Sequence, residues 1–494
     1  MKLKGRVWLV GAGPGDPGLL TVKGLQILER AEVVVYDRLV DPGILRHIPA
    51  NAERIDAGKQ NDRHSIPQEE IEHILIEKAR EGRLVVRLKG GDPFLFGRGG
   101  EEMEALMKAG IPCEPVPGVT SAIAAPASAG IPVTHRGYSS SLHVITAHRR
   151  RGGKPLDYAT LARLDGTLVF MMGVTELPNI CAGLIGAGMT PGTPAAVVER
   201  GTTSRQRCVR ASLASLAERA ERERVEAPAV IVVGGVAALS ERLDWRAALP
   251  LCGRRILAAG RPEKSGERLT ALLRSRGAEV WEVPCIRTEN LEGSLPSLSG
   301  YAWLVFTSPT GVRSLFQRLA AEHRDIREIG GAKIAAVGPS TAETLESFGL
   351  RTDLTPSVYS GASLGESLLS ALRLPSASPG GRLLLLRAQR GAPDLVRILK
   401  DGGADYDEVP LYRTIPLKGD PSAAEGFGDL DAAVFTSASA VRSFAETWPD
   451  VRLRAACIGE QTERAAREAG YETRVAQKAT PEDLADALED FFTK

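Results

Sequence analysis

Short runs of apolar and β-branched residues alternate along the chain with stretches that have the periodicity of amphipathic helices. The apolar runs lie at 7–10, 33–36, 84–88, 142–145, 168–170 and 230–233. Between them, 68–81 and 99–109 place their apolar residues on one helical face, and 19–30 is also helix-like. Near-continuous apolar runs are typical of buried strands, and their alternation with helices predicts an α/β fold.

A break in this pattern falls near 246–251, after the strand at 230–233 and around Pro250. A new apolar run then opens at 256–259. A chain of 494 residues is too long for one core. We therefore predict a first domain at 1–245, a linker at 246–250 and a second domain at 251–494.

The second domain contains an internal repeat. The unit VFTSPTGVRS, which begins at Val305, returns as VFTSASAVRS from Val434, and EVPCIRT from Glu282 returns as EVPLYRT from Glu408. The order of the units allows one α/β lobe to be inserted in the other through two extended crossing strands. Lobe A would comprise 251–286 plus 415–494, and lobe B would comprise 287–414. A cleft between two lobes is a common ligand site.

Composition removes several classes of function. Apolar residues make up 43% of the chain, charged residues 25%, and the net charge is +1. This balance argues against nucleic acid or an anionic membrane as a partner. The six cysteines form no CxxC and the seven histidines no HxxxH. We therefore expect no metal site and no disulfide framework, and a reducing, cytoplasmic location. The start shows no signal-peptide pattern.

A glycine-rich loop follows the first predicted strand. Gly13, Gly15 and Gly18 fit G-x-G-x-x-G, and Asp37 lies where an acidic ribose contact would fall, which favours a nicotinamide or flavin site. However, Pro14 and the proline at 17 remove backbone N–H groups that would cradle a pyrophosphate. A ligand without phosphates, such as S-adenosylmethionine, fits this loop better. The loop by itself leaves both readings open.

Several long motifs follow in order: GAGPGDPGLLT from 11, VVYDRLV from 34, HSIPQEEI from 64, VVRLKGGDPFLFGRGGEE from 85 and PGVTSAIAAPASAGIPVTHR from 117. Together they resemble the uroporphyrinogen-III C-methyltransferases of the tetrapyrrole methylase superfamily, over nearly all of 5–245. The resemblance implies a two-lobed α/β domain that is commonly a homodimer. It also implies transfer of two methyl groups from S-adenosylmethionine to uroporphyrinogen III, which gives precorrin-2.

The resemblance assigns roles to particular residues. Asp37 would be the proton acceptor and Lys59 the proton donor, whereas without it a strand-end cap and a solvated lysine are the ordinary readings. The methyl donor would contact Pro14, Gly90, Gly91, Asp92, Leu95, Thr120, Ser121, Met172 and Gly201. The carboxylates of the substrate would meet Arg38, Arg98 and Arg136. For the run at 149–151 a solvated loop is at least as good a reading. Ala147, Met171 and Gln60 depart from the glycine, tyrosine and arginine common in relatives.

The second domain resembles uroporphyrinogen-III synthase through its short repeated motifs and their order. That family cyclises hydroxymethylbilane and inverts the last pyrrole ring, and it needs no cofactor. Tyr412 matches a family tyrosine proposed to assist departure of the hydroxyl, although a packed strand tyrosine is an equal reading. Carboxylate anchors at helix starts would be Thr307, Ser308, Ser340, Thr341, Thr436, Ser437 and Thr462, with ordinary N-capping as the alternative.

The sequence therefore predicts a bifunctional enzyme of porphyrin biosynthesis, whose product would serve sirohaem or cobalamin. The second domain would make the substrate of the first. Two alternatives remain at this point. One is a methyltransferase with a non-catalytic tetrapyrrole-binding second domain, and the other is an NAD-dependent oxidoreductase.

Overall fold

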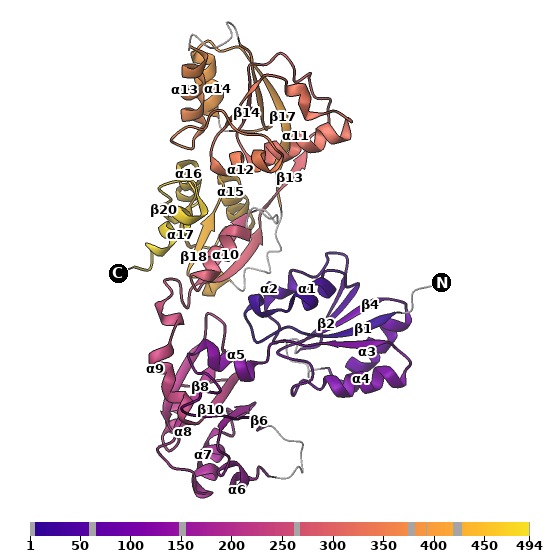
Figure 1. Cartoon of the computed structure of the whole chain (residues 1–494), viewed down its shortest axis with the longest axis vertical. Helices are drawn as coiled ribbons and strands as arrows, with labels where there is room; N and C mark the ends of the chain where they lie inside the picture. Colours follow the sequence, from indigo (N-terminus) through magenta and orange to yellow (C-terminus); the bar gives the residue numbers. More distant parts are fainter. Residues whose placement is uncertain are drawn as a thin grey trace. The chain divides into compact units, whose positions relative to one another are not determined.

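The computed structural model describes residues 5–58, 66–147, 155–260, 267–373, 381–391, 393–417 and 427–493. Lys59, Gln60, His148 and the arginines at 149–151 lie outside these ranges. The chain divides into two compact units (Figure 1). The first unit is Met1–Arg254 with Arg276–Glu279, and the second is Arg255–Ser275 with Val280–Lys494. Among the described residues, no helix combines the length and apolarity needed to cross a bilayer.

The first unit begins with an all-parallel sheet of order β3-β2-β4-β1-β5. Its strands are β1 (Arg6–Gly11), β2 (Val33–Tyr36), β3 (Glu53–Asp56), β4 (Leu84–Lys89) and β5 (Cys113–Val116). Figure 1 shows a helix pair on each face of this sheet. One pair is α1 (Val22–Leu28) and α2 (Pro42–Leu45), and the other is α3 (Gln68–Arg80) and α4 (Gly99–Lys108).

Alternation along each strand explains these two layers. In β1, Val7 and Leu9 pack toward α3 and α4, whereas Val10 packs toward α1 and α2. The predicted strands in this region are confirmed. The predicted helix at 19–30 begins later, at Val22, because Thr21 caps it: the Thr21 hydroxyl accepts a hydrogen bond from the Gly24 N–H at 3.1 Å. A 3₁₀ turn, Pro17–Leu19, occupies the positions before it.

A second, mixed sheet completes the first unit, in the order β6-β7-β10-β8-β9. Its strands are β6 (Leu142–Thr146), β7 (Thr167–Met171), β8 (Pro194–Glu199), β9 (Arg207–Ser212) and β10 (Ala229–Val233). Helix α5 (Ser121–Ser128) packs on one face, and α7 (Leu177–Gly186) and α8 (Leu216–Arg222) pack on the other. The short helices α6 (Tyr158–Leu161) and α9 (Ser240–Leu243) lie in the connections.

The second unit contains two five-stranded sheets. The first has the order β12 (Glu279–Pro284), β11 (Arg255–Gly260), β18 (Ala432–Phe435), β19 (Arg454–Cys457) and β20 (Glu472–Val475). The other has the order β13 (Ile286–Asn290), β17 (Tyr406–Pro416), β16 (Leu383–Ala388), β14 (Trp303–Phe306) and β15 (Lys333–Ala336). The helices of the unit are α10 (Glu267–Ser275), α11 (Pro309–Ala321), α12 (Pro339–Ser347), α13 (Gly361–Leu372), α14 (Pro393–Asp401), α15 (Ala438–Thr447), α16 (Glu460–Glu468) and α17 (Pro481–Glu489).

The chain passes between these two sheets on adjacent strands. Cys285 separates β12 in one sheet from β13 in the other, and β13 pairs antiparallel with the long strand β17. Ile286 lies opposite Pro416, and Asn290 lies opposite Tyr412. A bilobal α/β architecture with paired crossing strands was predicted from the repeat, and this topology confirms it.

Candidate functional site

Three loops at the carboxyl edge of the first parallel sheet approach one another at backbone distance. The N–H of Gly91, after β4, donates to the carbonyl of Gly13, after β1, at 2.7 Å, and the Gly13 N–H returns a bond at 3.2 Å. A Cβ on Gly118, after β5, would lie 2.2 Å from the Gly91 carbonyl oxygen. A Cβ on Gly11 would lie 2.5 Å from the Gly118 Cα. Only glycine permits this approach.

Asp92 fixes the shape of the same edge. One carboxylate oxygen accepts from the N–H groups of Phe94 at 2.8 Å and Leu95 at 3.1 Å, and the other accepts from the Gly118 N–H at 3.0 Å. Each oxygen therefore already has a backbone donor, and the side chain ties the loop after β4 to the loop after β5. The role predicted for Asp92 as an acceptor for ligand groups stays a prediction. Leu95 is half-buried.

The loop between β8 and β9 joins this edge from the second sheet. The Thr202 hydroxyl accepts from the Asp16 N–H at 3.1 Å, which ties that loop to the proline-containing turn at Pro14. A Cβ on Gly201 would lie 2.3 Å from the Ala125 Cβ in α5, so Gly201 sits against this helix. Thr120 caps α5 by accepting from the Ala122 N–H at 3.2 Å, and Ser121 is the first residue of the helix.

Five residues other than glycine have left-handed backbone conformations in the loops after β4, β7 and β8. Phe96, Arg98, Met172, Arg200 and Thr202 have φ values of 55°, 59°, 54°, 47° and 74°. Such values are uncommon for residues other than glycine and cluster at functional sites. Met172, directly after β7, is also 49% exposed. These loops therefore share the strain that is expected where backbone meets a ligand.

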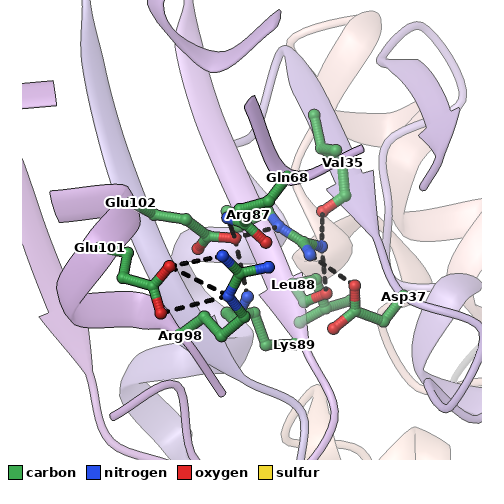
Figure 2. A network of polar contacts seen from close by, with 9 residues as sticks. All are labelled: Val35, Asp37, Gln68, Arg87, Leu88, Lys89, Arg98, Glu101 and Glu102. Carbon is green, nitrogen blue, oxygen red and sulfur yellow. Dashed lines mark hydrogen bonds and ion pairs between the residues drawn. The ribbon is translucent and has the colours of Figure 1, made fainter. Parts of the chain in front are cut away.

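A buried network of charges lies behind Asp37 (Figure 2). Nη2 of Arg87, on β4, donates to Oδ1 of Asp37, directly after β2, at 2.5 Å. Nε of the same guanidinium donates to Oε1 of Glu102 in α4 at 3.2 Å, and Nζ of Lys89 donates to that oxygen at 2.8 Å. Glu102 is fully buried and Arg87 and Lys89 nearly so, whereas the Asp37 side chain is 32% exposed. Burial lowers the pKa of Lys89, and the charge of Arg87 lowers it further.

Arg87, Lys89 and Glu102 were not predicted from the sequence as members of a site. A signal was present, because two cations at alternate positions of an apolar strand must share one buried face. The carboxylate that compensates them comes from a helix, and pattern alone does not identify it.

The predicted carboxylate-binding arginines of the first unit are all exposed. Arg38 follows Asp37 after β2. Arg98 is paired with Glu101 in the first turn of α4, Nη2 to Oε2 at 2.5 Å. Arg136 lies in the turn that opens at His135 before β6. Their roles remain predictions. Lys59, the predicted proton donor, lies outside the described residues.

In the second unit, the predicted anchors fall at the starts of four helices. Ser308 caps α11 and Ser437 caps α15, by accepting from the N–H groups of Gly311 at 3.0 Å and Ala440 at 3.2 Å. These two serines therefore perform the N-capping that was the alternative reading. Thr307 and Thr436 immediately precede them. The remaining predicted anchors lie in the first turns of α12 and α16: Ser340, which is exposed, and Thr341 and Thr462, which are buried.

Tyr412 lies on β17 with a nearly buried ring, packed in the core of its lobe. Its hydroxyl is 2.8 Å from the Ser308 hydroxyl. The phenol and the helix cap therefore form one small polar pair at a strand end. Among the residues that the structure describes, no group of three histidine, cysteine, aspartate or glutamate side chains could hold a metal ion.

Two family models match the chain in the order of its two units. Tetrapyrrole (corrin/porphyrin) methylases match residues 6–217, and uroporphyrinogen-III synthase HemD matches 267–486. A porphyrin biosynthesis protein HemD of Ruminiclostridium josui is 42% identical over 98% of this chain and 97% of its own length. The chain belongs to this HemD family of porphyrin biosynthesis proteins.

Other relatives of this HemD-family chain match a smaller share of it. A uroporphyrinogen-III C-methyltransferase of Bacillus subtilis is 43% identical over 70% of this chain and 72% of its own length. A siroheme synthase of Halorhodospira halophila is 50% identical over 49% of this chain and 50% of its own length. The solved uroporphyrin-III C-methyl transferase of Thermus thermophilus, complexed with S-adenyl homocysteine, is 43% identical over 48% of this chain and all of its own, with a TM-score of 0.42. The two family models and the HemD relative confirm the predicted fusion of methylase and synthase, and the oxidoreductase alternative is not favoured.

Proposed function

We propose that this HemD-family protein is a bifunctional enzyme that cyclises hydroxymethylbilane to uroporphyrinogen III and then methylates that product twice to precorrin-2. Residues 1–245 would form the methyltransferase domain, 246–250 the linker and 251–494 the synthase domain. The observation that carries the proposal is a partly exposed carboxylate, Asp37, held by Arg87 at the sheet edge where the glycine loops meet. That edge lies in a chain matched along its whole length by a HemD protein.

The loops of the first unit fit S-adenosylmethionine as the methyl donor. A Cβ on Gly91 would meet no atom within 4 Å, so the backbone there is open on one side to a ligand. Pro14 offers no N–H, and the Gly118 N–H is occupied by Asp92, which leaves few donors for phosphates. The donor would lie against Pro14, Gly90, Gly91, Asp92, Leu95, Thr120, Ser121, Met172 and Gly201. When bound, it supplies an electrophilic methyl group.

The protein's own task in methyl transfer is to place a pyrrole carbon in line with that methyl group and to accept a proton. The carbon–carbon bond forms as the sulfur–methyl bond breaks, and the proton released by the macrocycle goes to Asp37. Lys59 would return a proton to the ring system. Arg38, Arg98 and Arg136 are exposed and can turn toward the carboxylates of the macrocycle, since arginine pairs with carboxylates through two parallel hydrogen bonds.

The second unit would act on the linear precursor mainly by holding it in a cyclisable shape. The first turns of α11, α12, α15 and α16 would offer N–H groups to carboxylates, and Ser340 its exposed hydroxyl, whereas the predicted anchors Thr341 and Thr462 are buried. Tyr412 would assist the departing hydroxyl group as the ring closes and water leaves. No cofactor is needed for this reaction. We also expect a cytoplasmic homodimer that associates through the methyltransferase domain.

Each activity is testable on the full chain. With uroporphyrinogen III and S-adenosylmethionine, the account predicts a product that has gained two methyl groups, detected by mass spectrometry. With hydroxymethylbilane alone, it predicts the type III ring, which chromatography separates from the type I ring that closes without enzyme. Formation of only the type I ring would leave the second unit as a binding module. A titration with NAD serves as the negative control for the glycine loop.

A further inference from the structure

The carboxylate of Glu102 is the centre of the network behind Asp37, although it is remote from solvent. The side chain is fully buried in the first turn of α4, where an apolar residue would cost less free energy. Its Oε1 atom accepts hydrogen bonds from Arg87 and Lys89. The same atom also accepts from Nε2 of Gln68, at 3.1 Å. Its Oε2 atom has no hydrogen-bond partner among the described residues. A buried charge of this kind calls for a role beyond stability.

The guanidinium of Arg87 is held from several sides. Nη1 donates to the carbonyls of Val35 and Leu88, both at 3.3 Å, and Nε donates to Glu102. These three acceptors fix the plane of the guanidinium, so Nη2 points at Asp37 (Figure 2). Two cations and two carboxylates alternate through the network, which balances its formal charge.

We propose that Glu102 and Lys89 are positioning residues that act through Arg87 to hold the Asp37 carboxylate in its reactive orientation. This inference rests on the proposed function of Asp37. Glu102 binds one end of the guanidinium, Lys89 compensates Glu102, and the other end of the guanidinium holds one Asp37 oxygen. The second Asp37 oxygen remains for the substrate proton. A base must lie within hydrogen-bond reach of that proton, and a misplacement of about 1 Å can cost about 100-fold in rate.

The test is Glu102→Gln, which keeps an oxygen acceptor for Arg87 but removes the charge. We expect kcat for methyl transfer to fall by at least roughly tenfold, because a neutral acceptor holds the guanidinium more weakly than a carboxylate does, while KM for S-adenosylmethionine changes less than about twofold. The matched control is Glu53→Gln. Glu53 begins β3 at the opposite edge of the same sheet, and Lys78 Nζ lies 2.8 Å from its Oε1. That variant should keep its kcat.

A double-mutant cycle with Asp37→Asn separates positioning from folding. If Glu102 acts through Asp37, Glu102→Gln should lower kcat by less than about twofold in the Asp37→Asn background. An equal fold-loss in both backgrounds, or an unchanged kcat for Glu102→Gln alone, overturns the inference but leaves the methyltransferase function standing. Full activity of Asp37→Asn overturns the inference together with the role of Asp37. Should Glu102→Gln fail to fold, Lys89→Gln enters the same cycle with the same expectations.

Discussion

The two units differ in the side chains that lie at the carboxyl edges of their sheets. In the first unit, the end of β4 and the start of α4 bring three charged side chains, those of Arg87, Lys89 and Glu102, together behind Asp37, which follows β2. In the second unit, the ends of β14 and β18 carry serines that cap the next helices, and one phenol lies beside one of these caps.

This difference corresponds to two demands on a tetrapyrrole enzyme. Methylation of a ring carbon must dispose of a proton, which requires a carboxylate of defined charge and position. Ring closure of a flexible precursor is accelerated most when the protein holds the precursor in the geometry of the closed ring. Helix starts and a shaped cleft can do this. On the proposed function, proton chemistry would belong to the first unit and shaping of the substrate to the second.

The sharpest way to break the comparison is Asp37→Asn. The variant keeps the size of the side chain but cannot accept the substrate proton, so kcat for methylation of uroporphyrinogen III should fall by about 100-fold or more. Cyclisation of hydroxymethylbilane by the same preparation is the internal control and should be unchanged. Equal loss of both activities would mean that the aspartate supports the fold rather than the chemistry.

Tyr412→Phe tests the other side of the comparison. The phenol lies 2.8 Å from the Ser308 hydroxyl, and its removal leaves the cap on α11 intact. If shape supplies most of the rate, initial cyclisation rates should fall by less than about tenfold, with methylation unaffected. A loss above about 100-fold would make Tyr412 a principal acid and would erase the proposed contrast.

Asp41, a partly buried carboxylate in the first unit, should make the stability of the protein depend on pH. Asp37 is paired with Arg87, whereas the Asp41 carboxylate accepts a backbone N–H. Burial raises the pKa of Asp41 to about 6, although its carboxylate accepts from the Gly43 N–H at 2.7 Å. Since the folded pKa lies above the unfolded value of 3.8, stability falls as pH rises through this interval. Asp41→Asn, which still caps α2, should gain roughly 1 kcal/mol over the native protein between pH 5 and pH 8. Denaturant unfolding at both pH values measures this, and a constant difference would contradict it.

The smallest expected effect is that of a single helix cap. Ser437→Ala removes the acceptor for the Ala440 N–H and should destabilise the second unit by about 1 kcal/mol. Cyclisation at saturating hydroxymethylbilane should persist. Loss of binding without loss of stability would instead assign Ser437 to substrate recognition, so thermal unfolding and KM should be measured together.

Much of the fold could be predicted from the sequence, because buried strands are apolar runs and the internal repeat indicates the two lobes of the second unit. Strands such as β2 and β10 lie where they were predicted. The start of α1 was predicted too early, at residue 19. The helical pattern begins there, but Thr21 caps the helix and the helix begins at Val22.

Residues of the candidate site could be predicted from the sequence only where one continuous segment contains them. Asp37 and the glycine turns lie in continuous sequence motifs. The charged network of Arg87, Lys89, Glu102 and Asp37 forms only where β2, β4 and α4 meet in the fold, and the spacing of these residues along the chain does not predict that meeting. Likewise, the sequence did not predict that the Asp92 carboxylate would bind backbone N–H groups of two loops, and its contact with a ligand stays a prediction.

The most direct test of the central claim supplies the full protein with hydroxymethylbilane and S-adenosylmethionine that carries an isotopic label on its methyl group. The account predicts a cyclic product with the type III ring arrangement and two labelled methyl groups, seen by mass spectrometry and by chromatography of the oxidised product. An unlabelled ring, or a labelled ring of the type I arrangement, would contradict the assignment of one reaction to each unit.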